Sequence, residues 1–148
     1  MLANSDQRYD VIEADAILPR GSQSGNLYSV EFLTLVRERL APGGIYVQWA
    51  PTPRAVETFV AVFPHAVMLN PAWIMIGSRD PIPFDRDAPL ARLASPEVAA
   101  HLALGHAGCC DWAALTRDTT RHWRPGDPRA TAPLTDLFPR DEFYLNHK

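Results

Sequence analysis

Two polar residues stand at the ends of neighbouring hydrophobic segments, where an α/β protein would hold a ligand. Asp15 follows the β-branched segment 9–14, and Gln48 lies near the end of the next one, 45–49. Ligands of doubly wound α/β proteins gather outside the carboxyl ends of the strands, so Asp15 lies where chemistry is expected. Its plainer role is that of a loop residue or a helix cap. The amide of Gln48 can accept a hydrogen bond from an amine, or it can satisfy loop backbone.

A second group of chemically reactive side chains is His101, His106, Cys109 and Cys110. Residues five apart do not share a helix face, and no second Cys-x-x-Cys motif completes a tetrahedral ligand set. We therefore expect no metal site, and interpret these residues as partly buried helix positions. Adjacent cysteines cannot form an ordinary strain-free disulfide, which fits reducing surroundings. No Gly-x-Ser-x-Gly motif supports hydrolase chemistry.

The segments that flank Asp15 and Gln48 predict alternating strands and helices. Segment 9–14 is typical of a buried parallel strand, and Ser29 is a suitable N-cap for a helix that runs through Arg39. We expect the following Pro-Gly-Gly cluster, residues 42–44, to end that helix.

A second unit repeats the pattern. A strand is expected over 45–49, and Thr52-Pro53 predicts an N-cap with proline at the first helical position. That helix should bury its apolar face, and two further strands over 66–69 and 73–77 should form a hairpin through a tight reversal. Strand, helix, strand, helix and hairpin together imply an α/β fold whose mixed sheet ends in an antiparallel strand.

The second half of the chain has a different composition. The 148 residues include fourteen prolines against eight glycines, and the prolines crowd residues 81–139. This predicts short helices, over 88–93, 96–104 and 111–118, joined by irregular connections. We expect two regions, 1–80 with the sheet and 81–148 as a proline-rich helical extension packed on it.

Charge and hydropathy exclude several classes of function. A net charge of −3 and a pI near 5.9 provide no basic field for nucleic acid, so we expect no nucleic-acid partner. No apolar run is long enough to span a bilayer, and the first residues lack a signal-peptide pattern. The expected location is cytoplasmic.

Several motifs together resemble the polyamine synthase family, and more specifically spermidine synthase-like domains. The resemblance covers residues 8–78 well and the tail weakly. Its most selective part is the helix start Leu27-Tyr28-Ser29-x-Glu31-Phe32. The remaining matches are Tyr9-Asp-Val-Ile-x-x-Asp15, the loop with Pro19 and Gly21, Leu40-x-Pro42-Gly43-Gly44-Ile45, Val47-Gln48 and the closing Thr135-Asp136-x-x-Pro139-x-x-Glu142-Phe143.

The resemblance implies the second half of an S-adenosylmethionine methyltransferase-like Rossmann domain. It also implies transfer of an aminopropyl group from decarboxylated S-adenosylmethionine to an amine. Asp15 would orient and deprotonate the attacking amine and would also lie at the cofactor. Gln48 and Tyr28 would contact the substrate, and Leu27 would pack near the nucleoside. The plainer alternative is that Leu27 and Tyr28 pin the loop onto the helix.

The sequence departs from that family at Leu18, where the second carboxylate of an Asp-Ser-Ser-Asp-Pro motif would stand. An apolar residue cannot offset the desolvation of an ammonium group, so a different acceptor or none becomes plausible. The glycine-rich first turn and the acidic residue after the second strand are also missing upstream of Asp15. We therefore expect that this chain does not bind the sulfonium cofactor by itself.

Three functional hypotheses follow: a spermidine synthase-like transferase domain, a non-catalytic interaction module that keeps the half-sheet, and a fragment of a small-molecule methyltransferase. The expected partners are a small amine, if the domain is active, and a second copy of the chain or a missing N-terminal half. An uncovered edge strand over 9–14 is the reason for the last expectation.

Overall fold

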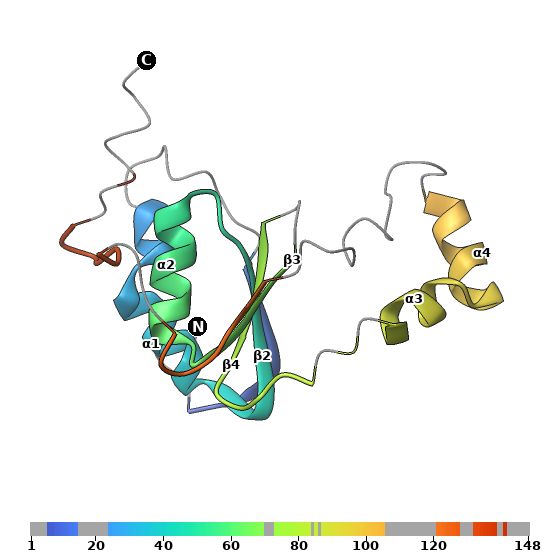
Figure 1. The fold of residues 1–148 in the computed structure, drawn as a ribbon, viewed down its shortest axis with the longest axis horizontal. Helices are drawn as coiled ribbons and strands as arrows, with labels where there is room; N and C mark the ends of the chain where they lie inside the picture. The colour runs from blue at the N-terminus through green and yellow to red at the C-terminus, as the bar shows by residue number, and fades with distance from the viewer. Residues whose placement is uncertain are drawn as a thin grey trace, which may run out of the picture.

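The structure is a computed structural model that describes residues 6–14, 24–69, 73–83, 85, 87–105, 121–127, 132–138 and 141. Within these ranges the chain forms a five-stranded sheet with helices packed against it (Figure 1). In chain order the elements are β1 (Tyr9–Ala14), η2 (Ser24–Tyr28), α1 (Val30–Glu38), β2 (Leu40–Trp49), α2 (Pro53–Val62), β3 (His65–Leu69), β4 (Ile74–Ser78), α3 (Asp87–Leu93), α4 (Pro96–Gly105) and β5 (Arg121–Trp123).

The sheet is mixed, as the sequence predicts, and its strand order is β1-β2-β4-β3-β5. Strands β1 and β2 run parallel, whereas β4 runs antiparallel to both of its neighbours, β2 and β3. The expected hairpin is therefore confirmed, and β4 lies between β2 and β3 rather than at the end. The proline-rich half also adds the short strand β5, antiparallel to β3.

Both main helices begin where the sequence predicts. The Ser29 side chain accepts a hydrogen bond from the backbone N–H of Phe32, which caps α1. Thr52 caps α2 in the same way through the N–H of Ala55, and Pro53 occupies the first helical position. These side chains satisfy backbone donors that a helix start leaves without intrahelical partners.

The expectation that residues 42–44 end the first helix is wrong. Helix α1 ends at Glu38, and the Pro-Gly-Gly cluster lies inside β2. The register between β1 and β2 shifts between Tyr9 and Val11, which marks an irregular pairing. Gly43 has φ +72°, and a Cβ on Gly44 would lie 2.8 Å from the carbonyl oxygen of Tyr9. Glycine therefore lets the two strands approach here.

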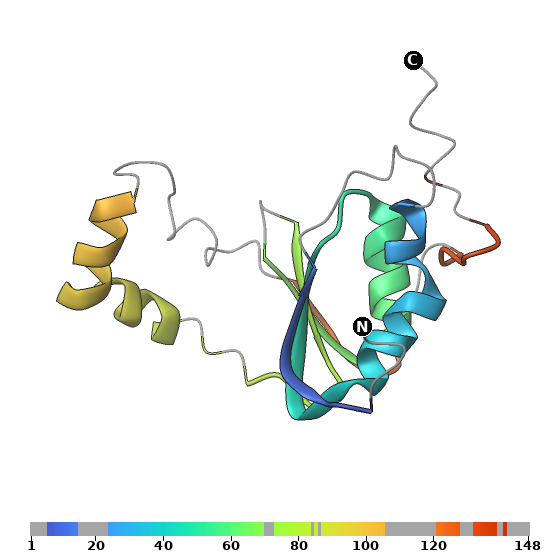
Figure 2. The same cartoon turned by 180° about the vertical axis from the view of Figure 1, so that it is seen from behind.

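The helices α1 and α2 cover the same face of the sheet, as both views show (Figures 1 and 2). Helices α3 and α4 contact one another and stand apart from the sheet, beyond its other face. They confirm two of the three short helices expected in the proline-rich half. The third, over 111–118, lies outside the described residues.

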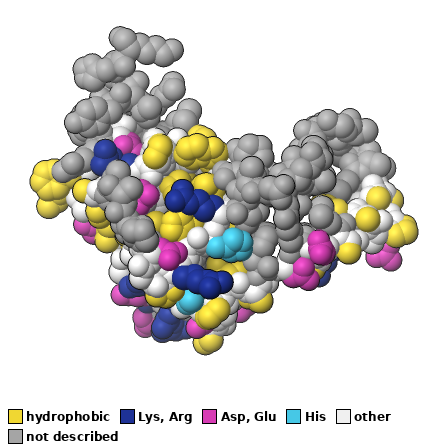
Figure 3. Space-filling model, viewed as in Figure 1, with side chains coloured by type: hydrophobic (Ala, Val, Ile, Leu, Met, Phe, Trp, Pro, Cys, Tyr) yellow, Lys and Arg dark blue, Asp and Glu magenta, His cyan; other side chains and the backbone are white. Residues whose placement is uncertain are grey.

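Apolar side chains also remain at the surface (Figure 3, yellow). Val11 is 59% exposed on β1, which is an edge strand of the described sheet. Leu137 and Phe138 are 84% and 63% exposed in a turn that precedes the C-terminal residues. An exposed edge strand carrying an apolar side chain is a ready surface for strand pairing.

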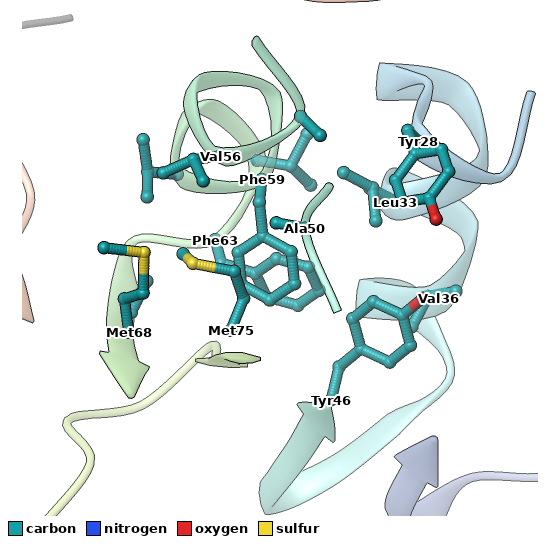
Figure 4. Packing of buried hydrophobic residues seen from close by; sticks show 14 of the residues in the cluster. Tyr28, Leu33, Val36, Tyr46, Ala50, Val56, Phe59, Phe63, Met68 and Met75 are labelled. Atoms are coloured by element: carbon teal, nitrogen blue, oxygen red, sulfur yellow. The ribbon is translucent and has the colours of Figure 1, made fainter. Parts of the chain in front are cut away.

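Aromatic rings fill the layer between the sheet and α2 (Figure 4). Tyr46 of β2 stacks on Phe59 and on Phe63, each with ring centroids 5.7 Å apart, and the two phenylalanine rings lie 4.7 Å apart. Gly77 of β4 lies beneath these rings, because a Cβ there would come within 2.6 Å of both phenylalanines. The absence of a side chain at Gly77 therefore lets the rings lie directly on the sheet.

Candidate functional site

The carboxyl ends of the parallel strands β1 and β2 lie side by side. Ala14, the last residue of β1, pairs with Gln48 of β2. Asp15 follows Ala14 in the chain, but Asp15 and Leu18 both lie outside the described residues. The strand ends that lead into the expected site are thus adjacent, in the geometry that α/β folds use for ligands.

The side chain of Gln48 is directed to the helix-covered face and is only 2% exposed. Its amide nitrogen donates a hydrogen bond to the backbone carbonyl of Leu27, at 3.0 Å. The sequence allows two roles for this amide, an amine contact or a hydrogen bond to backbone. The observed contact is the hydrogen bond to backbone. It ties the end of β2 to the short helix η2.

Tyr28, the last residue of η2, is 2% exposed and belongs to the hydrophobic core. The next residue, Ser29, donates from its hydroxyl to the carbonyl of Asn26 at 2.8 Å while it caps α1. Burial raises the pKa of Tyr46 far above its ordinary value, and the neighbouring Tyr28 acts in the same direction. The Tyr46 phenol therefore stays neutral at physiological pH.

Leu27 also lines a hollow with a volume of about 300 Å³. The floor is apolar, with Phe32 and Leu35, and the carboxylates of Glu31 and Asp136 stand among the lining residues. Glu31 Oε2 accepts a hydrogen bond from the backbone N–H of Asp136 at 3.1 Å, which joins the C-terminal turn to α1. An apolar floor beside two carboxylates is suited to an alkyl chain that carries a positive charge.

The start of α2 holds a polar cluster that the sequence analysis did not single out. The Thr52 hydroxyl donates to Asp141 Oδ2, and Arg54 Nε lies 3.2 Å from the other carboxylate oxygen. Arg54 also donates to the carbonyl of Ala132 at 3.3 Å. No local pattern could have predicted these contacts, because they join residues 78 to 89 positions apart. They fasten residues near the C-terminus beside the candidate site.

The expectation of no metal site concerns residues that are only partly described. His101 lies in α4, whereas His106, Cys109 and Cys110 lie outside the described residues. Among the residues that the structure does describe, no three His, Cys, Asp or Glu side chains come together as ligands. The described helices also include none with the length and apolar character needed to cross a bilayer.

Comparison with known proteins adds no family to these observations. A search against models of protein families finds no match, and a search of curated proteins finds none either. Function therefore rests on the strand ends, the Gln48 contact and the hollow beside Leu27.

Proposed function

We propose that this chain is the acceptor-binding half of a spermidine synthase-like aminopropyltransferase. The mixed sheet with an antiparallel hairpin supports this proposal, since the resemblance implies such a sheet. The observation that carries it is the pairing of Ala14 with Gln48. This pairing brings the residue before Asp15 next to Gln48, at the end of β2. Gln48 in turn is hydrogen-bonded to the carbonyl of Leu27, the first residue of the selective Leu-Tyr-Ser-x-Glu-Phe segment.

In the proposed reaction the nitrogen of a neutral amine attacks the carbon next to a sulfonium. A C–N bond forms as the C–S bond breaks, methylthioadenosine leaves with the sulfur electron pair, and the proton on nitrogen passes to the Asp15 carboxylate. A carboxylate near both groups serves as base and as electrostatic partner for the sulfonium. Gln48 would support the site by holding η2 through the Leu27 carbonyl, and Tyr28 by packing η2 into the core, since each is 2% exposed.

The hollow beside Leu27 favours an amine with an alkyl chain as acceptor. Leu18 lacks the charge of the family's second carboxylate, whereas Glu31 and Asp136 supply carboxylates to the hollow beside Leu27. Carboxylates attract an ammonium group, whereas Phe32 and Leu35 offer apolar surface to methylene groups.

Decarboxylated S-adenosylmethionine is the co-substrate of the proposed reaction. Leu27 and Asp15 are the two residues expected to meet it, and only Leu27 is described. The resemblance implies that Leu27 packs near the nucleoside, and its side chain could offer an apolar surface there. Binding of the whole molecule by this chain then depends on residues outside the described ranges.

The test is calorimetric titration of the folded chain with decarboxylated S-adenosylmethionine, S-adenosylmethionine and methylthioadenosine. Saturable heat with the first and third compounds supports the transferase, and addition of an alkyl diamine should then yield methylthioadenosine. Asp15→Asn should abolish product formation, whereas the matched change Asp10→Asn on the exposed part of β1 should not. Binding of S-adenosylmethionine alone would instead favour a methyltransferase fragment.

A second candidate, a non-catalytic interaction module, is favoured by the burial of Gln48 and Tyr28 and by the exposed edge of β1. In that reading the two residues only hold η2 in place, and β1 pairs with a second copy or with another α/β segment. Absence of heat with all three compounds in a folded sample would favour the module over the transferase.

A further inference from the structure

Four arginine side chains surround one hollow at the end of the sheet where its parallel strands begin. The hollow has a volume of about 510 Å³, and its lining residues are Arg8, Arg37, Glu38, Arg39, Pro64 and Arg79. Arg8 precedes β1, Arg39 precedes β2, and Arg79 follows the antiparallel strand β4. The hollow thus lies at the opposite end of the sheet from Gln48. A ligand bound there would be independent of the proposed transferase site.

Two of these guanidinium groups are anchored by backbone carbonyls. Arg8 donates to the carbonyls of Glu38 at 3.3 Å and Leu40 at 3.1 Å. Arg37 donates to the carbonyl of Val62, the last residue of α2, at 2.8 Å. The carboxyl end of a helix carries partial negative charge, so these contacts hold the cations in place.

Each of these anchoring contacts uses only one nitrogen of its guanidinium group. A guanidinium has five N–H donors in all. Side chains that are already held lose less conformational entropy when a ligand binds. The hollow therefore presents two cations that backbone carbonyls already hold in place.

Positive charge at this hollow exceeds the negative charge. The described residues that line it supply four guanidinium groups and one carboxylate, that of Glu38, an excess of three positive charges within the lining of a chain whose net charge is −3. The nearby carboxylate of Asp80 accepts a hydrogen bond from the backbone N–H of Gly43 at 2.8 Å. Basic side chains are visible at the lower end of the molecule in Figure 3 (dark blue).

We propose that this hollow binds a small molecule that carries two or three linked phosphate groups. Arginine forks match phosphate oxygens in bidentate geometry, and a phosphate group carries about −1.5 to −2 charges at neutral pH. A ligand with linked phosphates therefore balances the excess charge of the hollow, whereas a single carboxylate does not. A nucleotide and inorganic tripolyphosphate share this chemistry.

The experiment is calorimetric titration of the full chain with tripolyphosphate and, separately, with adenosine triphosphate at low salt. We expect saturable binding of one ligand per chain, and affinity that falls as salt is raised. Arg39→Gln and Arg79→Gln should each weaken binding by about three- to tenfold, in line with loss of one charge-assisted contact. Equal affinity for tripolyphosphate and adenosine triphosphate would identify the phosphates as the recognised group. Tighter binding of adenosine triphosphate would indicate that the hollow also contacts the nucleoside.

Arg92→Gln on α3 is the matched control, because it removes one exposed arginine away from the hollow. Circular dichroism and thermal unfolding of each variant confirm that it is folded. The proposal is overturned if neither ligand binds saturably, or if Arg92→Gln weakens binding as much as the two hollow variants do. If a single-stranded oligonucleotide bound much more tightly than either small ligand, and the Arg39 and Arg79 variants lost that binding, the ligand of the hollow would be a nucleic acid. That result would overturn the proposal of a small ligand.

Discussion

The hydroxyl of Thr58 accepts a hydrogen bond from the backbone N–H of Leu134 at 2.8 Å, although 76 residues separate them. The same hydroxyl donates to the carbonyl of Arg54 at 2.8 Å. Thr58 is 0% exposed and Leu134 is 1% exposed, so both lie in the core. One threonine in the middle of α2 thus anchors the segment that also carries the acidic edge of the hollow beside Leu27.

Replacing Thr58 by valine should destabilise the protein and loosen this segment. Valine keeps the shape but leaves the buried N–H of Leu134 without its acceptor, which costs about 1–3 kcal/mol of unfolding free energy. Urea denaturation measures the loss, and limited proteolysis should cut near residues 132–138 faster than in the wild type. Thr34→Val on α1 is the control, with an expected change below about 0.5 kcal/mol. Equal stability of the two variants would contradict the anchoring role.

Replacing Gln48 by leucine tests whether its amide holds η2. Leucine removes the donor to the carbonyl of Leu27, and we expect a loss of about 1–2 kcal/mol in unfolding free energy. Hydrogen exchange of the backbone amides of residues 24–29 should accelerate. Gln7→Leu, at an exposed position before β1, should leave that exchange unchanged. Unaltered exchange in the Gln48 variant would show that η2 is held by other contacts.

Alanine at Gly77 should overpack the aromatic layer. Its Cβ would lie 2.6 Å from atoms of both Phe59 and Phe63, which requires the rings to move. Overpacking of this kind costs about 1–3 kcal/mol, measured by chemical denaturation. The same change in a Phe59→Leu background should cost less, because the smaller side chain can shift. A double-mutant cycle with no coupling between the two positions would refute this account of Gly77.

Removing the Tyr46 hydroxyl should stabilise the protein. Among the described residues this oxygen is buried without a hydrogen-bond partner, and phenylalanine keeps the ring stack. We expect a gain of about 1 kcal/mol, measured by thermal and urea unfolding. A loss of similar size would mean that the hydroxyl makes a contact beyond the described residues.

The same tyrosine predicts a pH dependence. Burial, reinforced by Tyr28, raises the pKa of Tyr46 above its ordinary value of about 10. In the unfolded chain the phenol ionises at about pH 10, so stability present below that pH is lost as the pH rises further, by up to about 1.4 kcal/mol per pH unit. Tyr46→Phe should lose stability less steeply above pH 10. Parallel pH profiles for the two proteins would rule out this contribution.

The edge strand β1 should mediate self-association. Val11 is 59% exposed on this strand, and lysine there should oppose strand pairing by charge. Light scattering should give a dimer for the wild type at micromolar concentration and a monomer for Val11→Lys. Leu137→Lys removes an apolar side chain that is 84% exposed elsewhere, and this control should remain dimeric. A monomeric wild type would count against pairing through β1.

Local chemistry in the sequence was enough to predict the helices and most strands. Ser29 and Thr52 mark helix starts because their side chains accept hydrogen bonds from backbone N–H groups in the first turn of the helix. Pro53 suits the first helical position because its ring fixes φ near the helical value. The apolar face of α2, with Val56, Phe59 and Val60, follows from helical periodicity, and all three are buried. The α/β class and the antiparallel hairpin follow from the order of such segments.

The candidate site was predictable only in outline. The sequence places Asp15 just after one strand segment and Gln48 near the end of the next. Whether the Gln48 amide faces a ligand or the Leu27 carbonyl depends on how η2 packs, and that packing involves contacts between distant residues. The hollow beside Leu27 likewise includes Asp136, which reaches it through a turn near the other end of the chain.

What the sequence alone determined was therefore the helices α1 to α4 and the strands β1 to β4 in outline, because propensity, capping and periodicity act over a few residues. Only the tertiary structure decided that β4 lies between β2 and β3, that residues 42–44 belong to a strand, and that four arginines share one hollow. These features depend on strand pairing and on close approach of segments far apart in the chain. Such long-range contacts are selected by burial and backbone hydrogen bonding of the whole molecule, and no local pattern encodes them.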